Sequence, residues 1–201
     1  MPPFDLPPHI QERVICSISA AVKYEVPANI ILAIAEKEGG KPGQWVRNSN
    51  GTHDVGPMQF NTSYLADLAR YGITAHDVAS AGCYSFDLAT WRIRQHIRND
   101  KGDLWTKAAN YHSRTPQYNA TYRADLMRKA VKWADWLDAR FVTYDVTKSG
   151  VAASKLVTPQ AVQTKVKALH KAEPAAMLKS KMRGSWSPAH YVSRKLIING
   201  K

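Results

Sequence analysis

The sequence lacks any long hydrophobic run. Its longest uninterrupted apolar stretch covers only residues 30–35, whereas a membrane-spanning helix needs about 18 apolar residues or more. Residues 1–8 also lack the basic start and the apolar stretch of a secretory signal. We therefore expect no transmembrane segment, and we expect that a signal has been removed or that export follows another route.

Cysteine is scarce as well. Cys16 and Cys83 are the only two, and they form no CxxC pair. The seven histidines show no HExxH arrangement, so a zinc site has little support. The count allows a disulfide but also allows two buried free thiols.

Acidic residues are nearly absent from the C-terminal part. Residues 146–201 hold 11 Lys and Arg against one Glu, in a composition rich in Ala, Ser, Thr and Val. This change predicts a folded domain in residues 1–145 and a basic C-terminal extension in residues 146–201, partly disordered or with short helices. The extension is either simply solvated or binds an anionic polymer, a membrane surface or a nucleic acid. No motif for reading nucleic acid accompanies it, so nucleic acid is the least expected partner.

The overall composition is that of an ordinary globular protein, with 44% hydrophobic and 22% charged residues. Apolar residues recur at helical spacing in several segments, which predicts a mainly helical domain. Two of these series are Ile10, Val14, Ile18 and Val22, and Leu126, Ala130, Trp133 and Leu137.

A short helix is expected from Pro27 to Glu38, because Pro27 suits a first helical turn and Gly39 and Gly40 suit a C-terminal stop. Residues 41–61 are rich in the turn formers Pro, Gly and Asn, which predicts a long loop or a small hairpin. Loops of this length inside a compact domain are usually functional. Helices are expected to resume near Thr62, with breaks at Gly72, residues 100–102 and Pro116.

Glu38 is the first candidate for chemistry. It lies four residues after Ile34 and seven after Ile31, so it shares the apolar face of the expected helix. Apolar surroundings and the negative end of the helix dipole both disfavour a carboxylate, so both raise its pKa. A raised pKa is what a general acid needs at neutral pH. Taken alone, a glutamate near a helix end is more often a solvated side chain.

Neighbouring motifs favour the functional interpretation. The segments ILAIAEKEGG, NSNGTHDVGPMQFN and AANYHSRTP follow one another in this order. They resemble the Glu-Ser, Gly-Leu-Met-Gln and Ala-Tyr blocks of the lytic transglycosylase domain of the soluble lytic transglycosylase type, in the lysozyme-like superfamily. The resemblance covers approximately residues 10–140. It is greatest to the small transglycosylases of conjugation, type IV secretion and pilus systems.

The resemblance implies a fold and a reaction. The fold is α+β and mainly helical, a lysozyme-like fold with a small hairpin or long loop, here followed by the basic tail. The reaction cleaves the β-1,4 bond between N-acetylmuramic acid and N-acetylglucosamine in peptidoglycan and forms 1,6-anhydromuramic acid. It uses no cofactor, and its partners are glycan strands and the components of a secretion, conjugation or pilus machine.

The resemblance also implies roles at single positions. Glu38 corresponds to the catalytic acid and base, Gly56, Met58 and Gln59 to the block that lines the sugar subsites, and Tyr111 to the tyrosine beside the acid. A thioether can pack against a sugar face, an amide can hold polar groups and a phenol can orient an acid. The structural alternatives are core packing for Met58, a loop-closing hydrogen bond for Gln59 and a buried ring for Tyr111.

Two positions depart from the family pattern. Gly39 stands where the family usually has Ser, and Pro57 stands where it usually has Leu. The missing hydroxyl removes a hydrogen bond that can reach the substrate or the loop, so catalysis can be slower. A weakly catalytic, peptidoglycan-binding assembly factor is therefore one alternative function.

Asp54 supports another alternative. The segment NGTHDVGPMQFN also resembles the strand region of animal lysozymes, where an Asp at this point is the second catalytic carboxylate. A hydrolytic muramidase would use Glu38 as the acid and Asp54 as nucleophile or charge stabiliser. The structural interpretation, which we favour, is that Asp54 caps a turn through the amides of Asn50, Gly51 or Thr52.

The cysteines fit the same resemblance, because relatives often carry one Cys in the first helix and another before the helix that precedes the Tyr block. The resemblance therefore implies a disulfide between Cys16 and Cys83. Disulfides persist in oxidising compartments, so the implied location is the periplasm or cell envelope.

Overall fold

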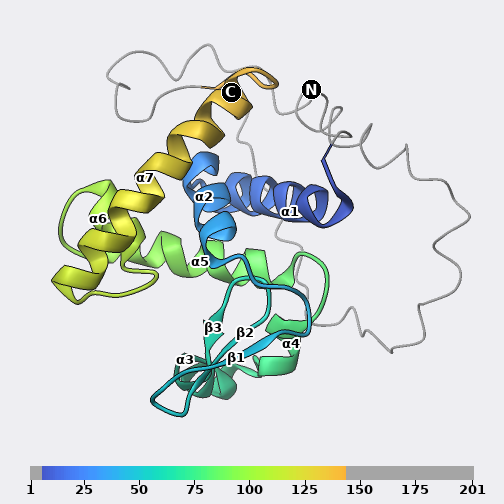
Figure 1. The fold of residues 1–201 in the computed structure, drawn as a ribbon, viewed down its shortest axis with the longest axis vertical. Coiled ribbons are helices and arrows are strands. Elements are labelled where there is room, and N and C mark those ends of the chain that lie inside the picture. Colours follow the sequence, from blue (N-terminus) through green and yellow to red (C-terminus); the bar gives the residue numbers. More distant parts are fainter. Residues whose placement is uncertain (1–5, 144–201) are drawn as a thin grey trace, which may run out of the picture. The chain divides into compact units, whose positions relative to one another are not determined.

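The computed structural model describes residues 6–143. Helices dominate this part of the chain, and three short strands form one small sheet (Figure 1). The predicted α+β, mainly helical fold class is confirmed. The elements are α1 (Pro8–Tyr24), α2 (Ala28–Glu38), β1 (Trp45–Arg47), β2 (His53–Val55), β3 (Phe60–Asn61), α3 (Thr62–Leu68), η2 (Ala69–Tyr71), α4 (Ala75–Ala79), α5 (Tyr84–Asn99), α6 (Leu104–Ala109) and α7 (Pro116–Asp138).

Helix α2 forms the centre of the helical part. Residues 30–35 are all buried, and α2 packs against both α1 and α7 (Figure 1). A helix that is apolar on every side needs such neighbours on every side. It ends at Glu38 because Gly39 adopts a left-handed conformation, with φ at 61°, and donates its amide to the carbonyl of Ala35 at 3.2 Å. The predicted helix from Pro27 to Glu38 is confirmed to within one residue.

The turn-rich stretch after α2 folds as a small antiparallel sheet in the order β1-β2-β3. Asp54 of β2 pairs with Val46 of β1 and with Asn61 of β3. Residues paired in this way point to the same face of a sheet, and their strand neighbours point to the other face. Val55 and Phe60 are such neighbours, and both are completely buried. The predicted loop or hairpin is thus a hairpin extended by a third strand.

The other predicted boundaries agree with the structure. α3 begins at Thr62, and Gly72 ends η2 in a left-handed conformation with φ at 75°. α5 ends at Asn99, directly before the predicted break at residues 100–102. Pro116 begins α7. Proline has no amide hydrogen, but at the first position of a helix this group would have no partner within the helix.

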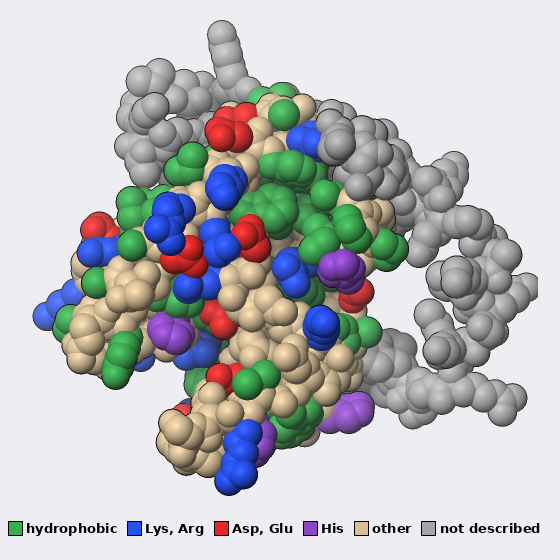
Figure 2. Space-filling model, in the orientation of Figure 1, with side chains coloured by type: hydrophobic (Ala, Val, Ile, Leu, Met, Phe, Trp, Pro, Cys, Tyr) green, Lys and Arg blue, Asp and Glu red, His purple; other side chains and the backbone are tan. Residues whose placement is uncertain are grey.

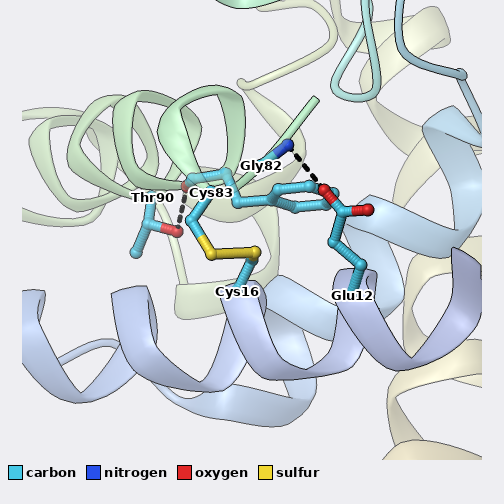
Figure 3. Close-up of a disulfide and its surroundings, with 6 residues drawn as sticks. Glu12, Cys16, Gly82, Cys83 and Thr90 are labelled. Atoms are coloured by element: carbon cyan, nitrogen blue, oxygen red, sulfur yellow. Dashed lines mark hydrogen bonds between the residues drawn. A yellow bond between two sulfur atoms is a disulfide. The ribbon is translucent and has the colours of Figure 1, made fainter. Parts of the chain in front are cut away.

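Cys16 and Cys83 form a disulfide that joins α1 to the residue before α5 (Figure 3). Their Cα atoms are 4.9 Å apart, and the two positions are 67 residues apart in sequence. Beside the bridge, the Glu12 carboxylate accepts a 2.6 Å hydrogen bond from the amide of Gly82 (Figure 3). In the chain-entropy model, a loop of this length gives a stabilisation of roughly 4 kcal/mol. The predicted pairing of the two cysteines is confirmed.

The predicted boundary near Asp145 and the basic extension of residues 146–201 lie outside the described residues. Within residues 6–143, no helix combines the length and the apolar character that crossing a bilayer requires.

Candidate active site

The C-terminal end of α2 lies between two lobes of the domain. α6 and the first half of α7 form one lobe, and the sheet with α3 and α4 forms the other (Figure 1). Figure 2 shows a notch between these lobes. Glu38 is the last residue of α2 and is half-buried. It has a hydrogen-bond partner on α7, and the charge of Asp54 on β2 acts on it electrostatically.

The chain directly after α2 packs closely against the turn between β2 and β3. A Cβ atom on Gly40 would lie 2.2 Å from the carbonyl oxygen of Gly56 and 2.6 Å from Nε2 of Gln59. A Cβ atom on Gly56, whose φ is 71°, would lie 2.1 Å from the carbonyl oxygen of Val78. Only glycine fits at both positions. The end of α2 and the turn of residues 56–59 therefore hold a fixed relative position.

Tyr122 of α7 is the side chain that holds Glu38. Its hydroxyl donates a 2.5 Å hydrogen bond to Oε1 of Glu38. The ring is buried, with 4% of its surface exposed. Burial and the nearby Glu38 carboxylate raise the pKa of Tyr122 well above its ordinary value, so the phenol keeps its proton and remains a donor.

Burial of the Glu38 carboxyl raises its pKa from 4.5 to about 7. Removal from water is the largest cause, because it penalises the charged form. The hydrogen bond from Tyr122 and the cations Lys37 and Arg92 lower the pKa, whereas Asp54 raises it further. A carboxyl group with this pKa can donate a proton and then accept one near neutral pH. The raised pKa that the apolar helix face predicts is confirmed.

Asp54 does not cap the turn between β1 and β2, so the expected capping role is wrong. The amide of Thr52 donates instead to Oδ1 of Asn50 at 3.1 Å. Asp54 Oδ1 accepts a 2.9 Å hydrogen bond from Nδ2 of Asn61, its register partner on β3. The reason is geometric. Asp54 lies within β2 rather than in the turn, and its side chain projects from the same face of the sheet as that of Asn61.

The turn at residues 56–59 is built from three of the predicted site residues. The Met58 side chain is completely buried. Nε2 of Gln59 donates a 2.8 Å hydrogen bond to the carbonyl oxygen of Gly56, and Gln59 adopts a left-handed conformation with φ at 50°. These contacts are core packing and loop closure, the structural alternatives for Met58 and Gln59. Contact of these residues with a sugar stays a prediction.

Tyr111 packs inside the domain rather than bonding to the acid. Its ring is 4% exposed and meets Phe60 edge-on at 6.3 Å, and its hydroxyl donates to the carbonyl oxygen of Met58 at 2.7 Å. Glu38 is close enough to raise the pKa of Tyr111, after burial, which is the larger cause. Tyr111 therefore supports the Met58 turn, and the tyrosine in direct contact with the acid is Tyr122.

The sequence carries a signal for the burial of Tyr122. Tyr122, Leu126 and Ala130 follow at intervals of four residues and are all buried, so the tyrosine shares the core-facing side of α7. The spacing does not predict the hydrogen-bond partner of Tyr122, because Glu38 lies 84 residues earlier in the sequence.

Within residues 6–143, no group of three or more His, Cys, Asp or Glu side chains gathers as metal ligands would. The polar residues that the fold does bring together are a half-buried acid, a phenol that donates to it and a carboxylate on the facing strand. This arrangement of an acid, a phenol and a carboxylate suits general acid and base catalysis.

Comparison with known proteins identifies a family and several relatives. Residues 15–130 match the family model described as Transglycosylase SLT domain. The chain is 28% identical over 132 residues to Protein IpgF of Shigella flexneri, and the aligned region covers 63% of this chain and 86% of that protein. It is 25% identical over 118 residues to Invasion protein IagB of Salmonella typhimurium (strain SL1344), and the aligned region covers 58% of this chain and 71% of that protein.

Proposed function

The chain belongs to the transglycosylase SLT domain family, and from this premise we propose that it is a peptidoglycan lytic transglycosylase. It cleaves the β-1,4 bond between N-acetylmuramic acid and N-acetylglucosamine and leaves a 1,6-anhydro sugar. The observation that carries the proposal is the state of Glu38, whose pKa burial raises to about 7 while Tyr122 donates to its carboxyl. The lysozyme-like fold of the family agrees with the helices and small sheet of this chain.

One carboxyl group suffices for both proton transfers. Protonated Glu38 gives its proton to the oxygen that links the two sugars, and the bond from that oxygen to the anomeric carbon of the muramyl sugar breaks. The acetamido group of the same sugar stabilises the positive anomeric carbon. Ionised Glu38 then removes the proton of the muramyl 6-hydroxyl, whose oxygen bonds to the anomeric carbon. Glu38 ends protonated, and no water is consumed.

Tyr122 acts on the ionised stage of this cycle. A phenol that donates to a carboxylate stabilises the charged form, so it limits the rise in pKa that burial causes. Glu38 is then acidic enough to release its proton and basic enough to recover one. We propose that Met58, Gln59 and Gly56 shape the floor of the sugar subsites and that Tyr111 holds this turn through the Met58 carbonyl.

The departure at Gly39 has a conformational explanation. Gly39 has φ at 61°, a left-handed conformation that a serine adopts only with strain. The glycine therefore gives α2 an unstrained end directly after the acid. This supports retained catalysis rather than the alternative of a merely binding protein, because the loss of the hydroxyl leaves Glu38 and Tyr122 in place.

A hydrolytic muramidase is the second candidate function. It is favoured by one observation, that the Asp54 carboxylate belongs to the electrostatic surroundings of Glu38 and raises its pKa. In that reaction Asp54 would stabilise the anomeric carbon and water would replace the 6-hydroxyl. The bond from Asn61 occupies Oδ1 of Asp54, which favours a role in fixing the sheet.

The disulfide between Cys16 and Cys83 supports a location in an oxidising compartment, for which we propose the periplasm or cell envelope. One relative carries the name of an invasion protein. Local opening of the cell wall for a secretion, conjugation or pilus apparatus is the process that we propose on these grounds.

For residues 146–201 we propose attachment to an anionic polymer or membrane surface through their 11 Lys and Arg. The test compares full-length protein with a truncation after residue 145. The truncated protein should still cleave short glycans but bind intact sacculi less, and binding by the full-length protein should fall with salt, since exposed charges are screened within about 10 Å at 0.1 M. Loss of cleavage on truncation would contradict the boundary.

The proposed activity is tested by release of muropeptides from purified peptidoglycan. Wild-type protein should release them, and Glu38→Gln should release none, because glutamine keeps the shape of the side chain but carries no titrating proton. Glu25→Gln is the matched control, since the Glu25 side chain is 75% exposed. Substantial release by a folded Glu38→Gln variant would remove Glu38 from the mechanism.

A further inference from the structure

His112 lies against the ring of Tyr122, although the proposed mechanism gives it no part. The ring centroids are 4.7 Å apart and the planes are inclined by 7°, so the two rings stack face to face. His112 belongs to the loop between α6 and α7, and it is exposed. Its backbone amide donates to the carbonyl of Ala109 at 3.0 Å, which fixes the start of this loop to α6.

A cation lies against the same ring. Nζ of Lys37 is 4.8 Å from the centroid of the Tyr122 ring. Lys37 is itself held by Asp125 of α7, at 2.7 Å. Within residues 6–143, Tyr122 is the only side chain with a hydrogen bond to Glu38. Whatever fixes the Tyr122 ring therefore fixes the side-chain hydrogen bond that the described residues make to the acid.

We propose that His112 is a positioning residue, whose ring stacks on Tyr122 and holds the phenol hydroxyl against Glu38. The inference rests on the proposed function, because it concerns the same acid and its reaction. An exposed histidine adds little to a hydrophobic core, but a stacked aromatic pair has a preferred geometry. The His112 ring therefore favours one orientation of the Tyr122 ring. His112 therefore acts on the acid through Tyr122 and needs no contact with the reacting atoms.

The charges near His112 favour a neutral ring. Lys37 approaches it from α2, Asp54 from β2, and Asp125 of α7 pairs with Lys37. Partial burial lowers the pKa of His112, Lys37 lowers it further, and Asp54 opposes them. A neutral imidazole places no second cation beside Lys37. The stack is thus compatible with the neutral pH at which Glu38 exchanges its proton.

Loss of the stack has a defined consequence for Glu38. The hydrogen bond from Tyr122 lowers the pKa of Glu38, against the larger effect of burial. In His112→Ala the Tyr122 ring gains freedom, the hydrogen bond is made less of the time, and the pKa of Glu38 rises. In His112→Phe a flat ring of similar size remains, so the pKa should return to the wild-type value.

The first experiment is an NMR titration of the Glu38 carboxyl carbon in full-length wild-type protein, His112→Ala and His112→Phe. We expect a midpoint at higher pH in His112→Ala only. His76→Ala is the matched control, because His76 is an exposed histidine on α4. An unchanged Glu38 titration in His112→Ala, or a failure of phenylalanine to restore it, overturns the inference. This measurement does not depend on enzymatic activity.

The second experiment measures glycan cleavage by the same variants as a function of pH. His112→Ala should lose roughly tenfold in kcat with little change in KM, as expected for about 1.4 kcal/mol of lost transition-state stabilisation. Its activity should persist to higher pH, and His112→Phe should behave as wild type. Equal losses in both variants, with unchanged melting temperatures, would show that the imidazole nitrogens take part directly and would overturn a positioning role.

The two experiments separate this inference from the proposed function. If wild-type protein releases no muropeptides, the proposed function fails, and the titration of Glu38 still decides whether His112 positions Tyr122. If wild-type protein is active and the Glu38 titration is the same in all variants, the inference about His112 fails alone.

Discussion

The hydroxyl of Tyr122 donates a 2.5 Å hydrogen bond to the carboxyl of Glu38, across 84 residues of sequence. This contact joins α7 to the end of α2. It opposes the rise in pKa that burial causes, so the two residues together set the pH range in which the acid can give and recover a proton.

Tyr122→Phe removes this hydrogen bond and keeps the ring. The pKa of Glu38 should rise above its present value of about 7, so the alkaline limb of the activity profile should move to higher pH. The maximal rate should fall roughly tenfold or more, because the ionised acid loses its donor. Tyr118→Phe, on the same helix but 60% exposed, is the matched control. Identical pH profiles for the two variants would contradict the role of Tyr122.

The raised pKa of Glu38 also makes a prediction for stability. The folded-state pKa of about 7 lies above the ordinary 4.5, so the folded state binds the proton more tightly than the unfolded chain. The stabilisation of the folded state that comes from binding this proton is fully present below pH 4.5. It is lost as pH rises through about 7. Glu38→Gln should therefore be more stable than wild type above this range, by up to about 3 kcal/mol. Denaturant unfolding at acidic and alkaline pH measures the difference, which a pH-independent offset would contradict.

Asp54→Asn tests the hydrolytic alternative. Asparagine keeps an oxygen that can accept the bond from Asn61, so the sheet should persist and activity should fall only modestly. The type of product should not change. A loss as large as that of Glu38→Gln would indicate that the Asp54 charge takes part in the reaction.

Removal of the disulfide should lower stability without changing the site. The bridge between Cys16 and Cys83 links α1 to the residue before α5, away from the contacts of Glu38. In Cys16→Ser with Cys83→Ser, the free energy of unfolding should fall by roughly 4 kcal/mol in the chain-entropy model. Thermal unfolding with and without reductant checks this. A melting temperature of wild-type protein that does not respond to reductant would contradict it.

The helical part of the fold was predictable because its signals are local. The end of α2 follows from Gly39 and Gly40, and the start of α7 follows from Pro116. The strands were not predicted one by one, because each has only two or three residues. That is too short for an alternating pattern to emerge from a turn-rich segment.

The site divides in the same way. The burial of Glu38 follows from its spacing to Ile31 and Ile34 on one helix. Its contact with Tyr122 and the pairing of Asp54 with Asn61 depend on helix packing and strand register. Neither is encoded in the spacing of nearby residues, so the turn-capping role assigned to Asp54 was wrong and Tyr122 was missed.

The identity of the sugar that wild-type protein leaves at the cleaved end tests the account most directly. Purified peptidoglycan is digested to completion, and the released muropeptides are analysed by mass spectrometry, with Glu38→Gln as the inactive reference. The account predicts ends that carry 1,6-anhydromuramic acid, each lighter by one water than a hydrolysed end. The reason is that Glu38 deprotonates the muramyl 6-hydroxyl, which attacks the anomeric carbon in place of water. Reducing muramic acid ends throughout would contradict it and would assign the chain to hydrolysis with Asp54 as the second carboxylate.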